Sequence, residues 1–304
     1  MEWLEGRRLM SADGPRVLSA TADNRGQVTL NFDQAVNPAT LTTRSLQIIA
    51  AGKAQSATLS FNKRRTTLII TARIRANVPY RVVLNGTLIK GLYTGLALDG
   101  EFNRRGASGN GVPGGNYDIG TTGTSAEATF STVKGVINVN LFAKQTPKTY
   151  ANFLAYANGG LYDNTVFDAL TGNGLYTLRG GGFLATSNLT PIKTIAPIAN
   201  ETSPSNNYGT LATYSTMPGE TTSRWIFNTD DNGSTLDTTN TAFGAIADAG
   251  SFAVLTALKS LPTVTVGTGF PVLPVLTASS GQLAVSNLAT VYRVAMLDTF
   301  YRTA

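Results

Sequence analysis

The chain contains no cysteine and no histidine among its 304 residues. Disulfides are therefore excluded, as are metal sites built on thiolate or imidazole ligands. Ser-His-Asp and Cys-His catalysis are excluded as well, because both require an imidazole base. An enzyme built on this sequence has to work with carboxylates, arginine, lysine, tyrosine, hydroxyl groups or backbone dipoles.

Long apolar runs are also missing, so we expect no transmembrane helix. The N-terminal stretch MEWLEGRRLMSADGP lacks the apolar centre of a secretory signal peptide. What is present is a hydrophobic content of 42% with a charged content of 14%, which permits real cores and argues against global disorder. A chain of this length is long enough for two domains of ordinary size.

Charge is unevenly distributed along the chain. Residues 1–105 hold 15 Lys and Arg against 7 Asp and Glu, and the remainder holds 9 against 11. A basic first half can indicate a polyanionic partner, but the charge distribution by itself favours a solvated basic sheet face. Because aromatic residues do not alternate with the basic ones, we expect no nucleic-acid partner.

Residues 15–102 carry a series of short apolar segments bounded by turn residues, which predicts a β-sandwich. Val28, Leu30 and Phe32 alternate with polar neighbours, as a half-buried strand requires. The stretches VTLNFDQAVNPATLTTRSLQI and NVPYRVVLNGTLIKGLYTGLALDGEF resemble bacterial Ig-like domains of surface proteins. Such domains are spacers or adhesive modules, and the resemblance implies no catalysis. Expected strands lie at 16–22, 27–32, 45–50, 56–61, 66–71 and 80–84.

Residues 103–124 are dense in glycine and poor in large apolar residues, which predicts a linker after the sandwich. With residues 1–14 as a tail, the second domain is expected at 125–304. Thr146-Pro147 opens a predicted helix, because threonine is a good N-cap and proline suits the first helical position. A second helix is expected over 251–259. Closing strands are expected at 263–266, 272–277, 283–285 and 290–297.

Between Thr146 and Phe243 the chain carries, in order, TPKTYANFLAYANGGLYDNTVFDA, LRGGGF, PIANE, GTLAT, TSRWIFN and TAFG. This series resembles the cyclophilin family of peptidyl-prolyl cis/trans isomerases. The resemblance implies a cyclophilin-like closed antiparallel β-barrel with two helices. The expected fold class is therefore mainly β, with an Ig-like β-sandwich followed by that barrel.

The chemistry of prolyl isomerisation makes one position decisive. A catalyst has to bind the twisted amide better than either planar form, and a donor near the prolyl nitrogen helps it do so. In cyclophilins an arginine of a Phe-His-Arg motif is this donor. Here the motif reads Phe167, Asp168 and Ala169, and alanine donates nothing. Arg179 and Arg224 are the candidate substitute donors.

The resemblance also implies a substrate-binding set, in which most polar and aromatic positions differ from the family. Arg179 stands where the family has its pocket glutamine, Tyr214 where it has a small residue, and Ile226 where it has an aromatic one. The family's tryptophan and histidine become about Thr235 and Asn240. The implied set is Phe167, Tyr176, Thr177, Arg179, Tyr214, Trp225, Ile226 and Leu236.

Two interpretations stay open at this point. In the first, Arg179 or Arg224 supplies the donor and leaves a weakened isomerase. In the second, the barrel is a non-catalytic module that binds proline-containing peptides or another protein, self-association and surface-layer partners included. No cofactor or metal is expected, because Asp230-Asp231-Asn232-Gly233-Ser234 with Asp237 lacks the glycine and glutamate positions of an EF-hand loop.

The N-terminus supplies a further indication of location. Leu4, Glu5, Arg7, Arg8, Leu9 and Met10 resemble a short motif near the start of many planctomycete surface proteins, with Gly6 where proline is usual. This resemblance implies an extracytoplasmic or cell-surface location, whereas the alternative for the same residues is a disordered tail.

Overall fold

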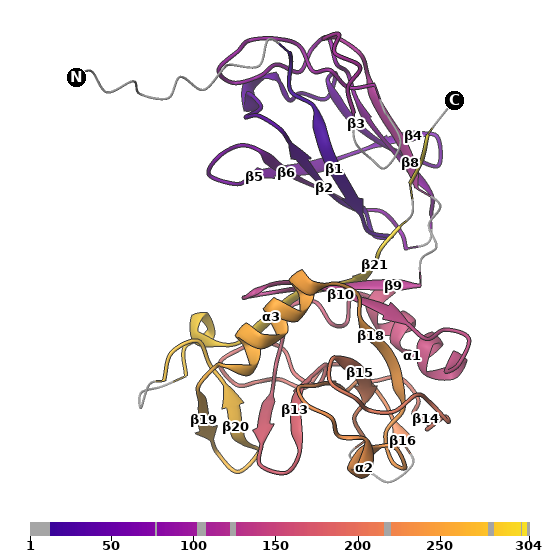
Figure 1. Cartoon of the computed structure of the whole chain (residues 1–304), viewed down its shortest axis with the longest axis vertical. Helices are drawn as coiled ribbons and strands as arrows, with labels where there is room; N and C mark the ends of the chain where they lie inside the picture. The colour runs from indigo at the N-terminus through magenta and orange to yellow at the C-terminus, as the bar shows by residue number, and fades with distance from the viewer. Residues whose placement is uncertain are drawn as a thin grey trace, which may run out of the picture. The chain divides into compact units, whose positions relative to one another are not determined.

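The computed structural model describes residues 13–76, 78–101, 108–121, 126–215, 220–278, 283–298 and 300–302. The chain divides into two compact units, Met1–Thr124 with Leu297–Ala304 and Ser125–Met296 (Figure 1). Each unit has a hydrophobic core of its own. The N-terminal residues that resemble a surface-protein motif lie outside the described residues.

The first unit contains two small antiparallel sheets that share one core. One sheet has the order β1-β2-β6-β5 and consists of β1 Val17–Ala22, β2 Gln27–Phe32, β6 Thr67–Ala72 and β5 Ala57–Phe61. The alternation expected for β2 is confirmed, since Val28, Leu30 and Phe32 are buried and their neighbours are half-buried. A 3₁₀ turn at Pro38–Thr40 leads from this sheet toward the other.

The second sheet of this unit has the order β22-β8-β7-β3-β4. Its strands are β22 Phe300–Arg302, β8 Tyr117–Thr121, β7 Tyr80–Leu84, β3 Leu46–Ala50 and β4 Lys53–Gln55. β8 lies inside the glycine-rich stretch for which a linker was predicted, and β22 lies near the end of the stretch predicted as the second domain. Both are strands because they pair with residues distant in the sequence: β7 pairs with β8, and β8 with β22.

The second unit is a nine-stranded antiparallel sheet curled into a half-barrel. Its order is β11-β21-β9-β10-β18-β15-β17-β13-β12. The strands are β9 Glu127–Thr132, β10 Gly135–Leu141, β11 Thr165–Val166, β12 Ala169–Gly172, β13 Tyr176–Gly180, β15 Thr210–Thr213, β17 Trp225–Asn228, β18 Ala242–Ile246 and β21 Thr290–Met296. β11 and β12 are the two edge strands of this sheet, although only Phe167 and Asp168 lie between them in the sequence.

Two helices pack on the curled sheet, and both were expected from the sequence. α1 Pro147–Asn158 begins at the predicted proline, although Thr146 makes no side-chain cap. Glu201 caps this helix instead, accepting hydrogen bonds from the backbone N–H groups of Lys148 and Thr149. α3 Ala249–Lys259 begins after Asp248, whose carboxylate accepts from the backbone N–H of Ser251. α2 Gly233–Leu236 is a single turn.

Smaller pieces complete the second unit. β14 Ile198–Ala199 pairs with β16 Glu220–Thr221, and β19 Thr263–Val266 pairs with β20 Phe270–Pro274. Of the latter pair, β20 contacts β12, the edge strand that pairs with β13 (Figure 1). The strand predicted at 283–285 is wrong, because a 3₁₀ turn occupies Val285–Asn287. There the side chain of Asn287 bonds both to the N–H and to the C=O of Thr277, which holds a turn in place of a strand.

Candidate functional site

A row of side chains crosses five neighbouring strands on one face of the curled sheet. Ala169 of β12 pairs with Arg179 of β13, and Arg179 pairs with Ile226 of β17. The row continues through Ala212 of β15 to Ala242 of β18. Directly paired residues of antiparallel strands point to the same face, so these side chains form one surface.

The opposite face of the same strands belongs to the main core. Leu178, Trp225 and Phe227 alternate with the row along β13 and β17 and are buried in that core. The ring of Trp225 meets that of Phe167 at 5.7 Å and nearly at right angles. Phe167 and Trp225, both predicted to line a substrate pocket, are 0% and 1% exposed and support the site from behind.

The glycines after Arg179 are explained by this tryptophan and by Arg224. Gly181 has a φ of +75°. A Cβ there would lie 2.5 Å from Nε1 of Trp225 and 2.7 Å from the carbonyl oxygen of Ser223. A Cβ on Gly182 would lie 2.6 Å from Nε of Arg224. Only glycine combines that backbone conformation with such a close approach.

Asp168 is the electrostatic centre of the site. Its side chain is fully buried at the junction between β11 and β12. Nε of Arg179 donates a hydrogen bond to Oδ1 of Asp168 at 2.6 Å, and Nη2 of Arg224 lies 3.8 Å from Oδ2. One carboxylate therefore faces two guanidinium groups, but it holds only Arg179 by a hydrogen bond.

The two arginines differ in their titration for physical reasons. Burial alone lowers the pKa of Arg179, but the Asp168 carboxylate and the Tyr214 hydroxyl outweigh it and raise that pKa above its ordinary value. Burial also lowers the pKa of Arg224; the charge of Arg179 lowers it further, and the more distant Asp168 does not compensate. Arg224 is thus the less well stabilised cation.

Tyr214 lies between the charged and the apolar parts of the site. Its ring is 4.7 Å from the guanidinium carbon of Arg179 and 6.0 Å from that of Arg224. With Leu175 it packs on the small cluster formed by Ala212, Ile226, Leu236 and Ala242. Ile226 is 1% and Leu236 7% exposed, so this apolar floor of the site is covered by the chain's own side chains.

Of the predicted substrate-binding residues, the structure brings together Arg179, Tyr214, Ile226 and Leu236, with Arg224 beside them. Thr177 lies further along β13, where its hydroxyl is 2.9 Å from that of Thr171. The backbone of Tyr176 is held by the side chain of Asn232, which accepts from its N–H and donates to its carbonyl oxygen.

Sequence reasoning missed the part played by Asp168 and by Phe183. Asp168 was noted only as a replacement for histidine, whereas it is the partner of both candidate arginines. The phenyl ring of Phe183 lies 4.7 Å from the guanidinium carbon of Arg224. A signal for Asp168 was present, because an acid had appeared in a motif that had lost its own arginine.

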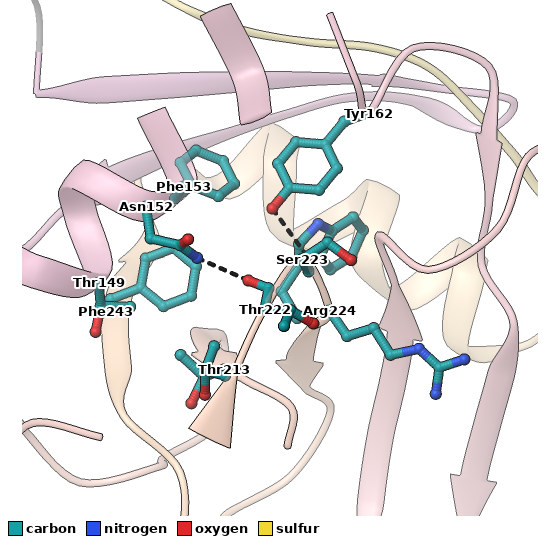
Figure 2. A pocket seen from close by; sticks show the side chains of 11 residues that line it. Thr149, Asn152, Phe153, Tyr162, Thr213, Thr222, Ser223, Arg224 and Phe243 are labelled. Atoms are coloured by element: carbon teal, nitrogen blue, oxygen red, sulfur yellow. Dashed lines mark hydrogen bonds between the residues drawn. The ribbon is translucent and has the colours of Figure 1, made fainter. Parts of the chain in front are cut away.

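A separate small pocket lies at the N-terminal half of α1 (Figure 2). The side-chain nitrogen of Asn152 donates to the carbonyl oxygen of Thr222, and the Tyr162 hydroxyl donates to that of Ser223. Arg224 borders this pocket, but Figure 2 shows its side chain extending away from Asn152 and Tyr162. The pocket is therefore distinct from the row of site residues.

The aspartates considered for a metal have other partners. Asp231 accepts a hydrogen bond from the backbone N–H of Tyr208, and Asp237 accepts from Ser205 and Asn206. Among the described residues, no group of three or more acidic side chains is placed to hold a metal ion. No described helix is both long enough and apolar enough to cross a membrane.

Comparison with known proteins identifies relatives of the second unit. The family model described as cyclophilin type peptidyl-prolyl cis-trans isomerase/CLD matches residues 127–279. A peptidyl-prolyl cis-trans isomerase of Streptomyces antibioticus is 32% identical over 117 residues, which are 38% of this chain and 68% of that protein. One of Acinetobacter baylyi is 31% identical over 140 residues, or 44% of this chain and 71% of that protein. A crystal structure of a Cryptosporidium parvum cyclophilin with the dipeptide Ala-Pro covers 56% of this chain and 98% of its own, at 19% identity and a TM-score of 0.42.

Proposed function

The chain belongs, through residues 127–279, to the cyclophilin-type peptidyl-prolyl cis-trans isomerases, and from that premise we propose that its cyclophilin domain binds proline-containing segments of other proteins with little or no isomerase activity. The observation that carries the proposal is the row Ala169–Arg179–Ile226. It has no donor at the family's arginine position, and its apolar floor is covered.

The loss of the donor bears on catalysis. Rotation about the prolyl amide localises the nitrogen lone pair, and a cationic donor stabilises that state more than either planar state. Ala169 offers no such group, and the Nε–H of Arg179 is already engaged by Asp168. Removal of one electrostatic donor of this kind costs about 10²–10³ in rate.

The covered floor bears on binding. A proline ring reaches Ile226 and Leu236 only after Tyr214 or Leu175 moves aside. Both covering groups are half-buried side chains, and we expect a rotamer change of one of them to admit a ring. Only molecules in which Tyr214 or Leu175 has moved aside can bind the ring. The apparent affinity is therefore the intrinsic affinity multiplied by the fraction of such molecules. We therefore expect binding that is weaker than the shape of the apolar floor alone would give.

A weak residual isomerase is the second candidate function, and Arg224 is the observation in its favour. Its nearest approach to Asp168 is 3.8 Å, which is too long for a hydrogen bond, and it makes no hydrogen bond to any described side chain. Its guanidinium therefore remains available to a substrate. This activity is expected to depend on Arg224 and to stay at least 10²-fold below that of a domain with the donor in place.

The experiment combines a protease-free isomerisation assay with peptide binding, on the full chain. The variants are Ala169→Arg, Arg179→Ala, Arg224→Ala and Tyr214→Ala, with thermal unfolding to identify those that fold. We expect binding of a prolyl peptide to wild type with negligible turnover, and tighter binding to Tyr214→Ala by about tenfold, or ~1.4 kcal/mol. Tyr208→Ala is the matched control, because Tyr208 packs on Phe252 away from the site.

The outcomes separate the two functions. Turnover in wild type that disappears in Arg224→Ala or Arg179→Ala supports the residual isomerase. High wild-type turnover that survives both changes contradicts the proposal, and so does the absence of peptide binding by both wild type and Tyr214→Ala.

We also propose a context for this domain. The curled sheet is closed into a barrel by residues 165–172, and the two-sheet unit before it is an Ig-like spacer on a surface or secreted protein. The shared core of its two sheets and the resemblance of its sequence support the spacer role. The excess of basic residues in the first half and the slightly acidic remainder favour contacts between copies or with other surface proteins. Fractionation of the native cells tests the location, and recovery in the cytosol alone contradicts it.

A further inference from the structure

The charges of the site do not balance. Arg179 and Arg224 bring two positive charges to the single negative charge of Asp168. Among the described groups, those that act on the charge of Arg224 are Asp168, Arg179 and Tyr214, and Asp168 is the only acid in that set. One positive charge is therefore left over at the edge of the binding surface.

Arg224 carries that excess charge close to two aromatic rings. Its guanidinium carbon lies 4.7 Å from the ring of Phe183 and 6.0 Å from that of Tyr214. Aromatic faces stabilise a guanidinium and leave its in-plane N–H groups free. The side chain is 20% exposed, and no described residue accepts a hydrogen bond from it. These N–H groups are therefore donors in a partly dehydrated place, where a charge-assisted hydrogen bond is strong.

We propose that Arg224 binds the carboxylate of an acidic side chain in the peptide held by this site, within about two residues of the proline. The inference rests on the proposed function, since it specifies which proline-containing segments the domain selects. A carboxylate matches the planar fork of a guanidinium and neutralises the charge left over by Asp168. The lowered pKa of Arg224, caused by burial and by the nearby Arg179, supports the view that this cation lacks a sufficient counter-charge.

The spacing from the proline follows from the strand. Arg224 immediately precedes β17, and Ile226 is the second residue of that strand. Residues two apart on a strand point to the same face and are about 6.6 Å apart, which is two residues of an extended peptide. A peptide whose proline ring lies over Ile226 therefore presents a residue about two positions away to Arg224.

The test measures binding of amidated proline peptides to the full chain by calorimetry. The peptides are identical except for glutamate, glutamine or lysine placed in turn at each of the two positions on either side of the proline. We expect glutamate at one of these positions to bind about tenfold tighter than glutamine, and lysine more weakly than both. The preference should shrink at high salt, because the charges remain partly exposed.

Variants connect that preference to Arg224. Arg224→Gln should remove the glutamate preference, so that the glutamate and glutamine peptides bind this variant with equal affinity. Arg224→Lys should keep part of the preference, because it retains the charge without the planar fork. Lys134→Gln, an equal charge change in the exposed turn between β9 and β10, should have no effect.

The results also distinguish this inference from the proposed function. Equal binding of glutamate and glutamine peptides at every position overturns the inference and leaves peptide binding intact. A glutamate preference that persists in folded Arg224→Gln overturns it as well. If no peptide binds at all, the proposed function fails and the inference fails with it.

Discussion

At the scale of single residues, Asp168 is expected to contribute to the stability of the fold, because it is fully buried and faces two arginines. Replacement by asparagine keeps its size and removes its charge. Two guanidinium groups would then lie close together without an anion, and a buried ion pair that loses one partner is strongly destabilised. Since both arginines reach solvent in part, we expect Asp168→Asn to cost about 2 kcal/mol. Urea unfolding measures this cost.

The exposed Asp230 provides the control for that measurement. Asp230→Asn removes the same charge from a surface position and should change the free energy of unfolding by less than about 0.5 kcal/mol. An equally small effect of Asp168→Asn would show that the two arginines do not depend on this carboxylate.

Residue-level reasoning from the sequence reached part of the site. The absence of a donor at Ala169 and the proximity of Arg179, Tyr214 and Ile226 follow from motif order. The ion pairing of Asp168 does not follow from it, because Asp168 and Arg224 are distant in the sequence and meet only when β17 pairs with β13. The burial of Trp225 behind the site likewise depends on which face of β17 meets the core.

Helix α1 likewise depends on a contact between residues that are distant in the sequence. Thr146-Pro147 correctly marked where the helix begins, but the threonine side chain does not cap it. Glu201 does so from a distant loop, with its carboxylate on the N–H groups of Lys148 and Thr149 and on the Thr149 hydroxyl. A helix N-terminus carries partial positive charge, so a carboxylate there stabilises it. Local sequence signals cannot identify a cap that comes from another segment.

This cap leads to a prediction for the helix. Glu201→Gln removes the negative charge and one acceptor while retaining the shape of the side chain, and we expect a loss of about 1 kcal/mol in the free energy of unfolding. Thermal and urea unfolding followed by circular dichroism measure it. Glu220→Gln, at an exposed position on β16, is the control. If Glu201→Gln and Glu220→Gln have the same free energy of unfolding, the Glu201 carboxylate does not stabilise the helix.

Strands were recognised where apolar residues alternate and missed where pairing is remote. β2, β3, β6 and β7 were expected close to their observed bounds. β8 was not expected, because Tyr117–Thr121 follows a glycine-rich stretch and is a strand through its pairing with β7. β8 therefore depends on a partner that is distant in the sequence, and local alternation does not reveal such a partner.

Over the whole molecule, the described residues form two units with separate cores, and the chain returns to the first unit at its end. Leu297 bridges to Asp23, and the N–H of Asp298 donates to the carbonyl oxygen of Ala22. Composition and motif order predicted a β-rich protein with a cyclophilin-like second part. They could not predict this return, because the last residues carry no pattern that distinguishes one sheet from another.

The return of the chain makes stability depend on pH through Asp298. Burial raises the pKa of this carboxyl group to about 6; the Thr121 hydroxyl opposes the shift and the Asp23 carboxylate adds to it. The protonated form is therefore favoured in the folded state. Its contribution is fully present below the unfolded value of 3.8 and is lost as the pH rises to about 6.

Asp298→Asn should remove this dependence, because an amide stays neutral at every pH in that window. We expect the variant and wild type to be equally stable near pH 4, and the variant to be more stable by about 2 kcal/mol at pH 7. Urea unfolding of the full chain at a series of pH values measures the difference between the two proteins, in which the contributions of the other acids cancel. If the difference in unfolding free energy between the two proteins stays constant from pH 4 to pH 7, the prediction is wrong. Such a result would show that the folded protein stabilises the charged form of Asp298 throughout this range.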